Sequence, residues 1–322
     1  MSRVDRTDTQ ADSSHTAADP ASAVVRSAVV RSAVARDVTA GIDQPAESSV
    51  DTKLDADTKL GVSAASDCQP SALRCFRLTL AYDGTNYFGW QRQPKHPSVQ
   101  AAVEKAIRAM TGDKQTHAWA SSRTDTGVHA LGQSAVFTTA GWPAPADRIP
   151  LAINTKLPMD VVVRDAVEVP LRFNPLRAST GKRYRYYVYS ARKPDPIGAR
   201  TQWWVPQQMQ LSPMLAAAEL FLGTHDFAAF QTSGSPRSTT VREVRELTVE
   251  AVEHMDGTRF TIEVEASGFL YNMVRNIVGT LVQVGVGRKP PQWVTEVLVS
   301  RDRRQAGQTA PACGLFLLEV KY

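Results

Sequence analysis

The chain has 322 residues, of which 43% are hydrophobic and 21% are charged, so it can bury a substantial core and is not a fibrous protein. Residues 1–72 hold 7 Lys and Arg against 11 Asp and Glu, which leaves 30 basic and 21 acidic residues in the remaining 73–322. This basic body attracts polyanions such as nucleic acids, although a charge that only keeps the protein in solution is an equal alternative.

Cysteine usage and hydropathy indicate the compartment. Cys68, Cys75 and Cys313 are odd in number and form no CxxC pair, so they predict neither a disulfide framework nor a zinc site. No apolar run is long enough to span a bilayer, and the N-terminus lacks the charged start and apolar run of a secretory signal. We therefore expect a protein of the reducing cytoplasm with no membrane partner.

Residues 1–72 differ in composition from the rest of the chain. They are rich in Ala, Ser, Thr and Asp, hold no aromatic residue, and include the local repeat VRSAVVRSAVARD at residues 25–37. Such a segment cannot bury enough apolar surface to offset the entropy lost on ordering, and its early acidic residues argue against an organelle transit peptide. We expect a disordered N-terminal extension over 1–72 and a folded domain over 73–322.

Alternating apolar residues predict a first strand from about Arg74 to Tyr82. Ser98 then serves as the N-cap of a helix whose apolar face recurs at helical spacing until Gly112. Further helices are predicted from Pro213 to about 222 and over 270–284. The remaining predicted strands are 116–121, 133–138, 161–169, 183–189, 241–252, 259–266 and 315–322. Strands and helices mixed without strict alternation are typical of an α+β fold.

The sequence SSRTDTGVHA at residues 121–130 is a polar loop between two apolar strands, a frequent position for active sites. Asp125 can act there as a nucleophile, general base or metal ligand, with Arg123 or another arginine keeping it ionised; alternatively it only closes a turn before Gly127. His129 is either a base or metal ligand, or a structural hydrogen-bonding residue. No other His or Cys lies at ligand spacing, so we expect no metal site.

Basic and aromatic residues interleave in KRYRYY at residues 182–187, so that Tyr184 and Tyr186 share one face of a strand and Arg183 and Arg185 the other. The tyrosine face can stack on a nucleobase while nearby cations hold phosphates. Alternatively, the tyrosines lie in the core and the arginines in solvent. The pattern alone leaves both interpretations open.

Arg275 interrupts an apolar stripe in the predicted helix over 270–284. The stripe itself needs no functional explanation. A cation beside a core stripe is costly unless it is paired, so Arg275 should reach a carboxylate, for which Asp125 is a candidate, or extend to solvent.

Together these segments resemble the tRNA pseudouridine synthase A family over essentially all of residues 74–322. Residues 82–91, YDGTNYFGWQ, are similar to the family's opening YDGxxYxGWQ signature, and SVQ at 98–100 to the helix start that follows it. Residues 123–130, RTDTGVHA, look like the catalytic GRTDxGVHA loop. Residues 311–317, PACGLFL, are similar to the AxGLxL strand.

The resemblance implies a role for five residues. Asp125 is the nucleophilic aspartate, and Arg275 is its salt-bridge partner. Tyr184 packs against the target uracil, Arg123 contacts RNA or extrudes the base, and Leu315 is an apolar wall of the uridine pocket.

Two positions depart from the family pattern. Ser122 replaces a glycine, and FNPLR at 173–177 replaces Phe-x-Ala-Arg-Phe, so that Leu176 occupies the family's arginine position and Arg177 lies one residue further on. Neighbouring strand residues face opposite ways, so Arg177 is not expected to make the family contact.

For the whole chain, the resemblance implies an α+β fold with a mixed, mainly antiparallel sheet flanked by helices, built as two similar α/β halves around a central catalytic cleft. It implies a homodimer that isomerises uridine to pseudouridine at positions 38–40 of the tRNA anticodon stem-loop, without metal or organic cofactor. Two other functions compete: a non-catalytic RNA-binding protein on the same scaffold, and a metal-dependent nuclease using Asp125 and His129, which would need further clustered carboxylates.

Overall fold

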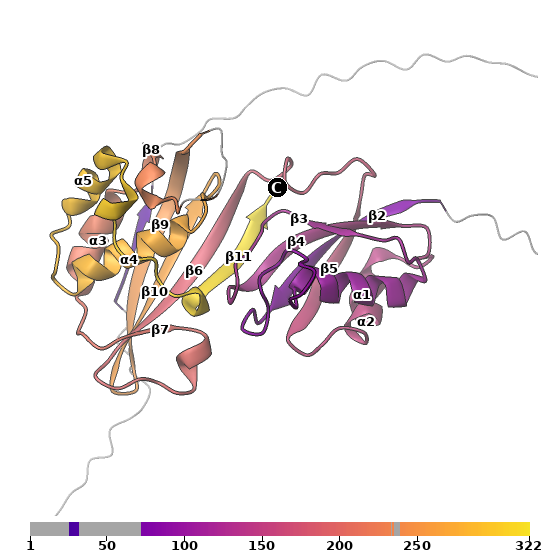
Figure 1. Cartoon of the computed structure of the whole chain (residues 1–322), viewed down its shortest axis with the longest axis horizontal. Helices are drawn as coiled ribbons and strands as arrows, with labels where there is room; N and C mark the ends of the chain where they lie inside the picture. The colour runs from indigo at the N-terminus through magenta and orange to yellow at the C-terminus, as the bar shows by residue number, and fades with distance from the viewer. Residues whose placement is uncertain (1–25, 32–71, 233, 235–238) are drawn as a thin grey trace, which may run out of the picture.

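The computed structural model describes residues 26–31, 72–232, 234 and 239–322. Within these residues, a single mixed sheet of eleven strands runs through the molecule in the order β1-β9-β10-β6-β11-β4-β2-β5, with β3 paired to β4, β7 to β6 and β8 to β9 (Figure 1). The strands are β1 (Arg26–Arg31), β2 (Arg74–Tyr82), β3 (Ala118–Ala120), β4 (His129–Thr139), β5 (Val161–Val169), β6 (Gly181–Ser190), β7 (Trp203–Val205), β8 (Gly223–Asp226), β9 (Val241–His254), β10 (Gly257–Ala266) and β11 (Leu315–Lys321).

Helices pack on this sheet in two groups. The helices are α1 (Val99–Thr111), α2 (Ile149–Asn154), α3 (Leu211–Glu219), α4 (Met273–Gly285) and α5 (Trp293–Ser300). Figure 1 shows α1 and α2 beside β2 to β5, and α3, α4 and α5 beside β8 to β10. The predicted α+β class with a mixed, mainly antiparallel sheet is therefore confirmed. None of the helices described here is both long and apolar enough to cross a bilayer.

The strands form two groups, β1, β9, β10, β6 and β11 on one side and β4, β2 and β5 on the other, which meet at one parallel pair. β11 runs parallel to β4, with Phe316 opposite His129 and Leu317 opposite Ala130. Every other pairing along the main strand order is antiparallel. The C-terminal strand thus lies beside the strand that follows the 121–128 loop, although almost two hundred residues separate them in the chain.

Local patterns explain the predicted elements. In β2, the alternate residues Phe76, Leu78 and Leu80 are fully buried, as a strand with one covered face requires. In α1, the Ser98 hydroxyl accepts a hydrogen bond from the Ala101 N–H (3.4 Å), and Gly112 ends the helix in the left-handed conformation. The predicted strands and the three predicted helices are present, with ends shifted by a few residues.

The short elements α2, α5, β7 and β8 were not predicted. Each is at most eight residues long, so its apolar residues are too few to establish a period, and packing stabilises it instead. For example, Ile149 and Ile153 of α2 are fully buried against the first group of strands.

The expected disordered extension contains one described element. β1 adds to the edge of the sheet by antiparallel pairing with β9, with Arg26 opposite Ala251 and Arg31 opposite Glu246. At these six residues the structure differs from the expectation, because the edge of β9 offers unpaired backbone groups that a short strand can satisfy. The rest of residues 1–71 lies outside the described residues.

Candidate active site

A cleft of about 1040 Å³ contains all five predicted site residues. Arg123 and Asp125 reach it from the loop between β3 and β4, Tyr184 from β6, Arg275 from α4 and Leu315 from β11. The walls therefore come from both groups of strands and from segments far apart in the chain.

The opening YDGTNYFGWQ segment supports the backbone of the 121–128 loop. The Trp90 N–H donates to the Thr124 carbonyl (3.0 Å), and the Gly127 N–H donates to the Tyr87 carbonyl (3.3 Å). Gly89 has a φ of 85°, and a Cβ there would lie 2.5 Å from the Thr124 carbonyl oxygen. The glycine is required because the two backbones touch directly beside Asp125.

Asp125 closes a turn with its backbone and faces the cleft with its side chain. Its carbonyl accepts a hydrogen bond from the Val128 N–H (3.1 Å), and Gly127 between them has a φ of 76°, so the Asp125 backbone closes a turn. Its side chain lines the cleft and is half-buried. No hydrogen bond to this carboxylate is formed by the residues that the structure describes.

Two opposing effects act on the Asp125 carboxyl. Burial raises its pKa, and the positive charge of Arg275 lowers it in part. The expected salt bridge is not formed: in the described chain, the Arg275 guanidinium donates instead to the Ala310 carbonyl (2.6 Å) and to Asn272 Oδ1 (2.9 Å). These two acceptors orient the guanidinium, which acts on Asp125 through space rather than by direct contact.

Tyr184 forms a buried wall of the same cleft. Its side chain is 7% exposed, and its ring meets the Phe269 ring edge-on at 5.0 Å between centroids. Its hydroxyl lies 2.9 Å from the Ser122 hydroxyl. Burial raises the pKa of Tyr184 to about 12, so the phenol is neutral near pH 7. Ser122, which departs from the family glycine, therefore has a specific contact in this chain.

The faces of β6 separate as the alternation predicts. Tyr186 is fully buried and donates its hydroxyl proton to the Pro311 carbonyl (2.6 Å), which supports the segment leading to Leu315. Arg183 and Arg185 lie on the opposite face, where they form ion pairs with Glu246, Glu263 and Glu265. These arginines do not line the cleft.

Other cations occupy the cleft wall. Lys182 lies on the same face of β6 as Tyr184, and its Nζ donates to the Ser121 carbonyl (2.8 Å). The alternation in KRYRYY is the sequence signal that places Lys182 on the Tyr184 face. Leu176 lines the cleft and is 58% exposed, whereas Arg177 does not line it. The exposed Arg172 supplies a guanidinium from the same loop.

His129 is buried and held by contacts with the protein. Its ring is 2% exposed and stacks on Phe316 with 4.6 Å between centroids. Nε2 lies 2.9 Å from the Arg200 carbonyl and 3.1 Å from the Cys313 carbonyl, so this nitrogen carries a proton. His129 does not line the cleft. Throughout the described ranges, no group of three or more His, Cys, Asp and Glu side chains is arranged to hold a metal ion.

Comparison with known proteins identifies the family. The sequence model of the family described as tRNA pseudouridine synthase matches residues 79–175 and 217–322. The chain is 43% identical over 250 residues to tRNA pseudouridine synthase A of Acetivibrio thermocellus, covering 78% of this chain and 100% of that protein. It is 46% identical over 246 residues to tRNA pseudouridine synthase A of Myxococcus xanthus, covering 76% and 91%.

A third relative, tRNA pseudouridine synthase A of Geotalea uraniireducens, is 44% identical over 251 residues, which are 78% of this chain and 100% of that protein. The matched residues include Arg123, Asp125, Arg275 and Leu315 of the cleft, whereas Tyr184 lies between the two matched ranges. The chain therefore belongs to the tRNA pseudouridine synthase family, and its enzyme class is isomerase.

Proposed function

We propose that this chain isomerises uridine to pseudouridine at positions 38–40 of the tRNA anticodon stem-loop, with Asp125 as the nucleophile. The observation that carries the proposal is the Asp125 carboxylate, which faces the cleft half-buried and accepts no hydrogen bond within the described residues. Its oxygens are therefore free to contact a substrate. Family membership and the names of the relatives support the substrate class.

The reaction exchanges one bond of the ribose for another. The bond between ribose C1′ and uracil N1 breaks, a bond between C1′ and uracil C5 forms, and the proton of C5 is lost while N1 gains one. Atoms balance without an oxidant or reductant. Ionised Asp125 attacks the ribose or the uracil ring and holds the reacting partner until the base has turned.

The other cleft residues suit this reaction through an aromatic surface, an apolar wall and a positive charge. The target base must leave its stack, which costs roughly a few kcal/mol, and the neutral Tyr184 ring offers an apolar surface against which it can pack. Leu315 is 6% exposed and closes the pocket with an apolar wall. Arg275 stabilises the ionised form of Asp125 by its charge.

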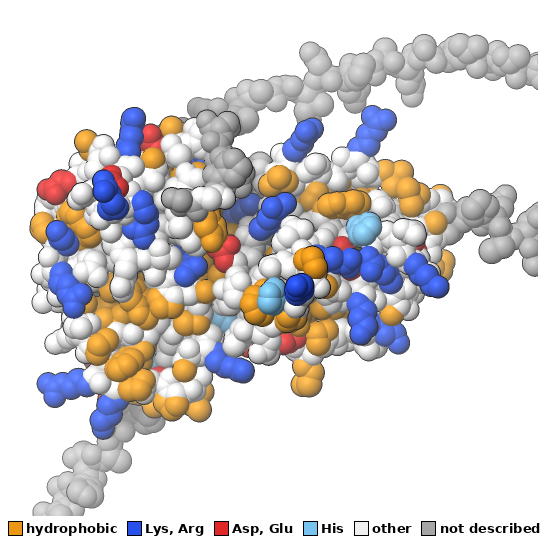
Figure 2. Space-filling model, in the orientation of Figure 1, with side chains coloured by type: hydrophobic (Ala, Val, Ile, Leu, Met, Phe, Trp, Pro, Cys, Tyr) orange, Lys and Arg blue, Asp and Glu red, His pale blue; other side chains and the backbone are white. Residues whose placement is uncertain are grey.

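RNA affinity is assigned to the basic surface. Figure 2 shows Lys and Arg side chains spread over this face of the molecule with few Asp and Glu among them. Arg123 and Arg172 are exposed at the cleft and can contact phosphates or help to extrude the base. We further propose that the enzyme acts in the cytoplasm as a homodimer with tRNA lying across both subunits.

An assay of purified protein with uridine-containing tRNA, run in parallel with and without a chelator, tests the proposal. Wild-type protein should form pseudouridine at positions 38–40, and Asp125→Asn should form none while still shifting tRNA in a salt-dependent binding assay. Asp165→Asn is the matched control, since Asp165 is exposed on β5 outside the cleft. Unmodified RNA with wild-type protein would favour a non-catalytic binding protein, and cleavage abolished by the chelator would favour a nuclease.

A further inference from the structure

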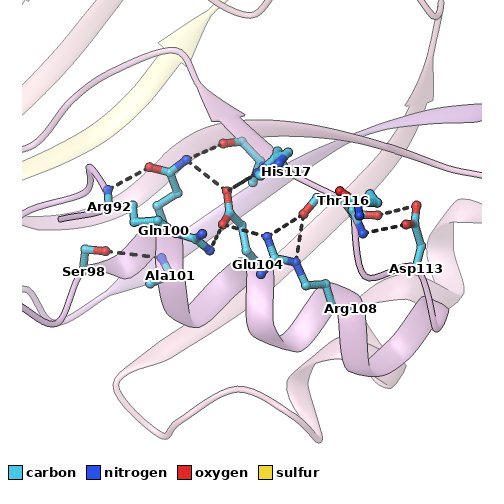
Figure 3. Close-up of polar contacts among 11 residues, drawn as sticks. Arg92, Ser98, Gln100, Ala101, Glu104, Arg108, Asp113, Thr116 and His117 are labelled. Carbon is cyan, nitrogen blue, oxygen red and sulfur yellow. Dashed lines mark hydrogen bonds and ion pairs between the residues drawn. The ribbon is translucent and has the colours of Figure 1, made fainter. Parts of the chain in front are cut away.

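Glu104, near the middle of α1, is a buried carboxylate outside the set of predicted site residues. Its side chain is 1% exposed. Oε1 accepts hydrogen bonds from the Gln100 amide (3.1 Å) and the Ala118 backbone N–H (3.1 Å). Oε2 pairs with the guanidinium groups of Arg92 and Arg108, the latter at 3.3 Å (Figure 3). We call these five residues the Glu104 network.

The first arm of the Glu104 network reaches the catalytic loop through the opening signature. The Gln100 side-chain oxygen accepts from the Arg92 N–H (2.9 Å), and the Gln100 backbone N–H donates to the Trp90 carbonyl (3.0 Å). The Trp90 N–H in turn donates to the carbonyl of Thr124 (3.0 Å). Only one peptide bond separates Thr124 from Asp125.

The second arm reaches the same loop from its other end. Glu104 holds the N–H of Ala118, and the Gln100 amide donates to the Ala118 carbonyl (3.0 Å). Ala118 begins β3, which ends at Ala120, directly before the 121–128 loop. The Glu104 network is thus bonded to the strand that enters the loop and, through Trp90, to the residue before Asp125.

The Gln100 side chain is committed to these protein contacts although it lines the cleft. Both amide protons are donated, to Glu104 and to Ala118, and the amide oxygen accepts from Arg92. A side chain whose donors are all in use cannot offer one to a substrate without losing a protein contact. Gln100 therefore transmits position rather than binding RNA.

We propose that Glu104 is a positioning residue for the isomerisation: it fixes Gln100, Ala118 and the opening signature so that the catalytic loop presents Asp125 at the correct place. This inference rests on the proposed role of Asp125. Displacing a reacting group by about 1 Å can lower a rate by about a hundredfold. Binding of tRNA should change little, because it depends on many phosphate contacts spread over the surface.

Glu104→Gln tests the proposal, because the amide keeps the size of the side chain but removes its charge and directs an N–H group at an arginine. The measurements are the single-turnover rate of pseudouridine formation at saturating enzyme and the Kd for the same tRNA. We expect the rate to fall about tenfold or more and Kd to change by less than about threefold. Glu168→Gln is the control, since Glu168 is an exposed carboxylate paired with Arg74 outside the cleft. It should leave both quantities unchanged.

Gln100→Met is the second variant, which removes the side-chain links to Ala118 and Arg92 while Glu104 keeps its two arginines. It should also lower the single-turnover rate more than it changes Kd. If Glu104→Gln does not fold, the Gln100→Met protein tests the positioning role by itself. Melting temperatures ensure that rates are compared among folded proteins. An unchanged single-turnover rate in the folded variants would overturn the inference, even if their melting temperatures fell, because the network would then be purely structural.

The outcomes also separate this inference from the proposed function. If Asp125→Asn is inactive and the Glu104 and Gln100 variants turn over normally, the positioning role alone is wrong. If Asp125→Asn is as active as wild type, the nucleophile assignment is wrong, and the positioning role that rests on it is overturned as well.

Discussion

Asp125 and Glu104 belong to the same group of strands and helices, but their surroundings are opposite. The Asp125 carboxylate is half-buried at the cleft and accepts no hydrogen bond from the residues described. The Glu104 carboxylate is almost fully buried and is paired with two guanidinium groups, an amide and a backbone N–H. A carboxylate whose acceptor sites are filled can hold its neighbours in place, whereas one with unfilled sites is available for chemistry.

The largest expected difference between the two carboxylates is in stability. Glu104→Ala leaves the buried Ala118 N–H and the Gln100 amide without their acceptor and parts two guanidinium groups from their shared carboxylate, so it should lower the free energy of unfolding by about 3–5 kcal/mol. Asp125→Asn should not destabilise the fold at pH 7. The folded-state pKa of Asp125 is raised, so stability falls as pH rises through that pKa, and the amide avoids this loss.

Urea denaturation of both variants at pH 7 measures this difference. Because Arg275 bonds to Ala310 and Asn272 rather than to Asp125, Asp125→Asn does not break an ion pair with Arg275. An Asp125→Asn protein that is as destabilised as Glu104→Ala would contradict the inference that Glu104 stabilises the fold and Asp125 does not.

Variants of Tyr184 test how much the cleft wall beside Asp125 contributes to the reaction rate. Tyr184→Ala removes the ring that packs on Phe269 and faces the cleft, so we expect single-turnover rates to fall about a hundredfold or more. Tyr184→Phe keeps the ring and loses only the contact with Ser122, so the rate should fall less than about tenfold. Equal and severe loss in both variants would implicate the hydroxyl itself, for example in proton transfer.

The pH dependence of the reaction tests the charge that acts on Asp125. In the proposed mechanism Asp125 attacks in its ionised form, so the single-turnover rate should fall as pH falls through the pKa of Asp125, which burial raises above the ordinary 3.8. Arg275→Gln removes the cation that lowers this pKa, and the acidic limb of the profile should therefore move to higher pH. A profile that Arg275→Gln leaves in place would show that Arg275 acts in another way.

Ser122→Gly should have the smallest effect. It restores the glycine of the family pattern and removes one hydrogen bond to the Tyr184 hydroxyl, a contact worth about 1 kcal/mol. We expect the single-turnover rate to change by less than about fivefold, in the same direction as Tyr184→Phe. The double variant should lose little more than either single one, since both remove the same bond.

Much of the fold could be predicted from local sequence patterns. The alternation in β2, the Ser98 and Gly112 ends of α1 and the polar loop around Asp125 all express rules that act over a few residues. The family resemblance selected five residues that do line one cleft. The short helices α2 and α5 escaped prediction because their stability comes from packing.

The contacts of the charged groups could not be predicted in the same way. Arg275 was expected to pair with Asp125, but its guanidinium meets the Ala310 carbonyl, 35 residues away in the chain. The sequence pattern does not predict that Glu104 is buried, since a glutamate beside the apolar stripe of a helix is usually exposed. Gln100 and Arg108 lie one helical turn from Glu104 on either side, but the donors from residues 92 and 118 reach it only in the folded chain.

By itself, the sequence determined the periodic elements of the folded region, the loop that carries Asp125, and the turn that Gly127 allows two residues later. These follow from the covalent geometry and hydrophobicity of neighbouring residues. Only the tertiary structure decided that β11 runs parallel to β4 and that Arg183 and Arg185 face away from the cleft into ion pairs. It also decided that Glu104 is paired, whereas Asp125 has no hydrogen-bonding or ion-pair partner among the described residues. The physical reason is that hydrogen bonds and ion pairs depend on positions in space to within a few tenths of an ångström, which patterns along the chain do not specify.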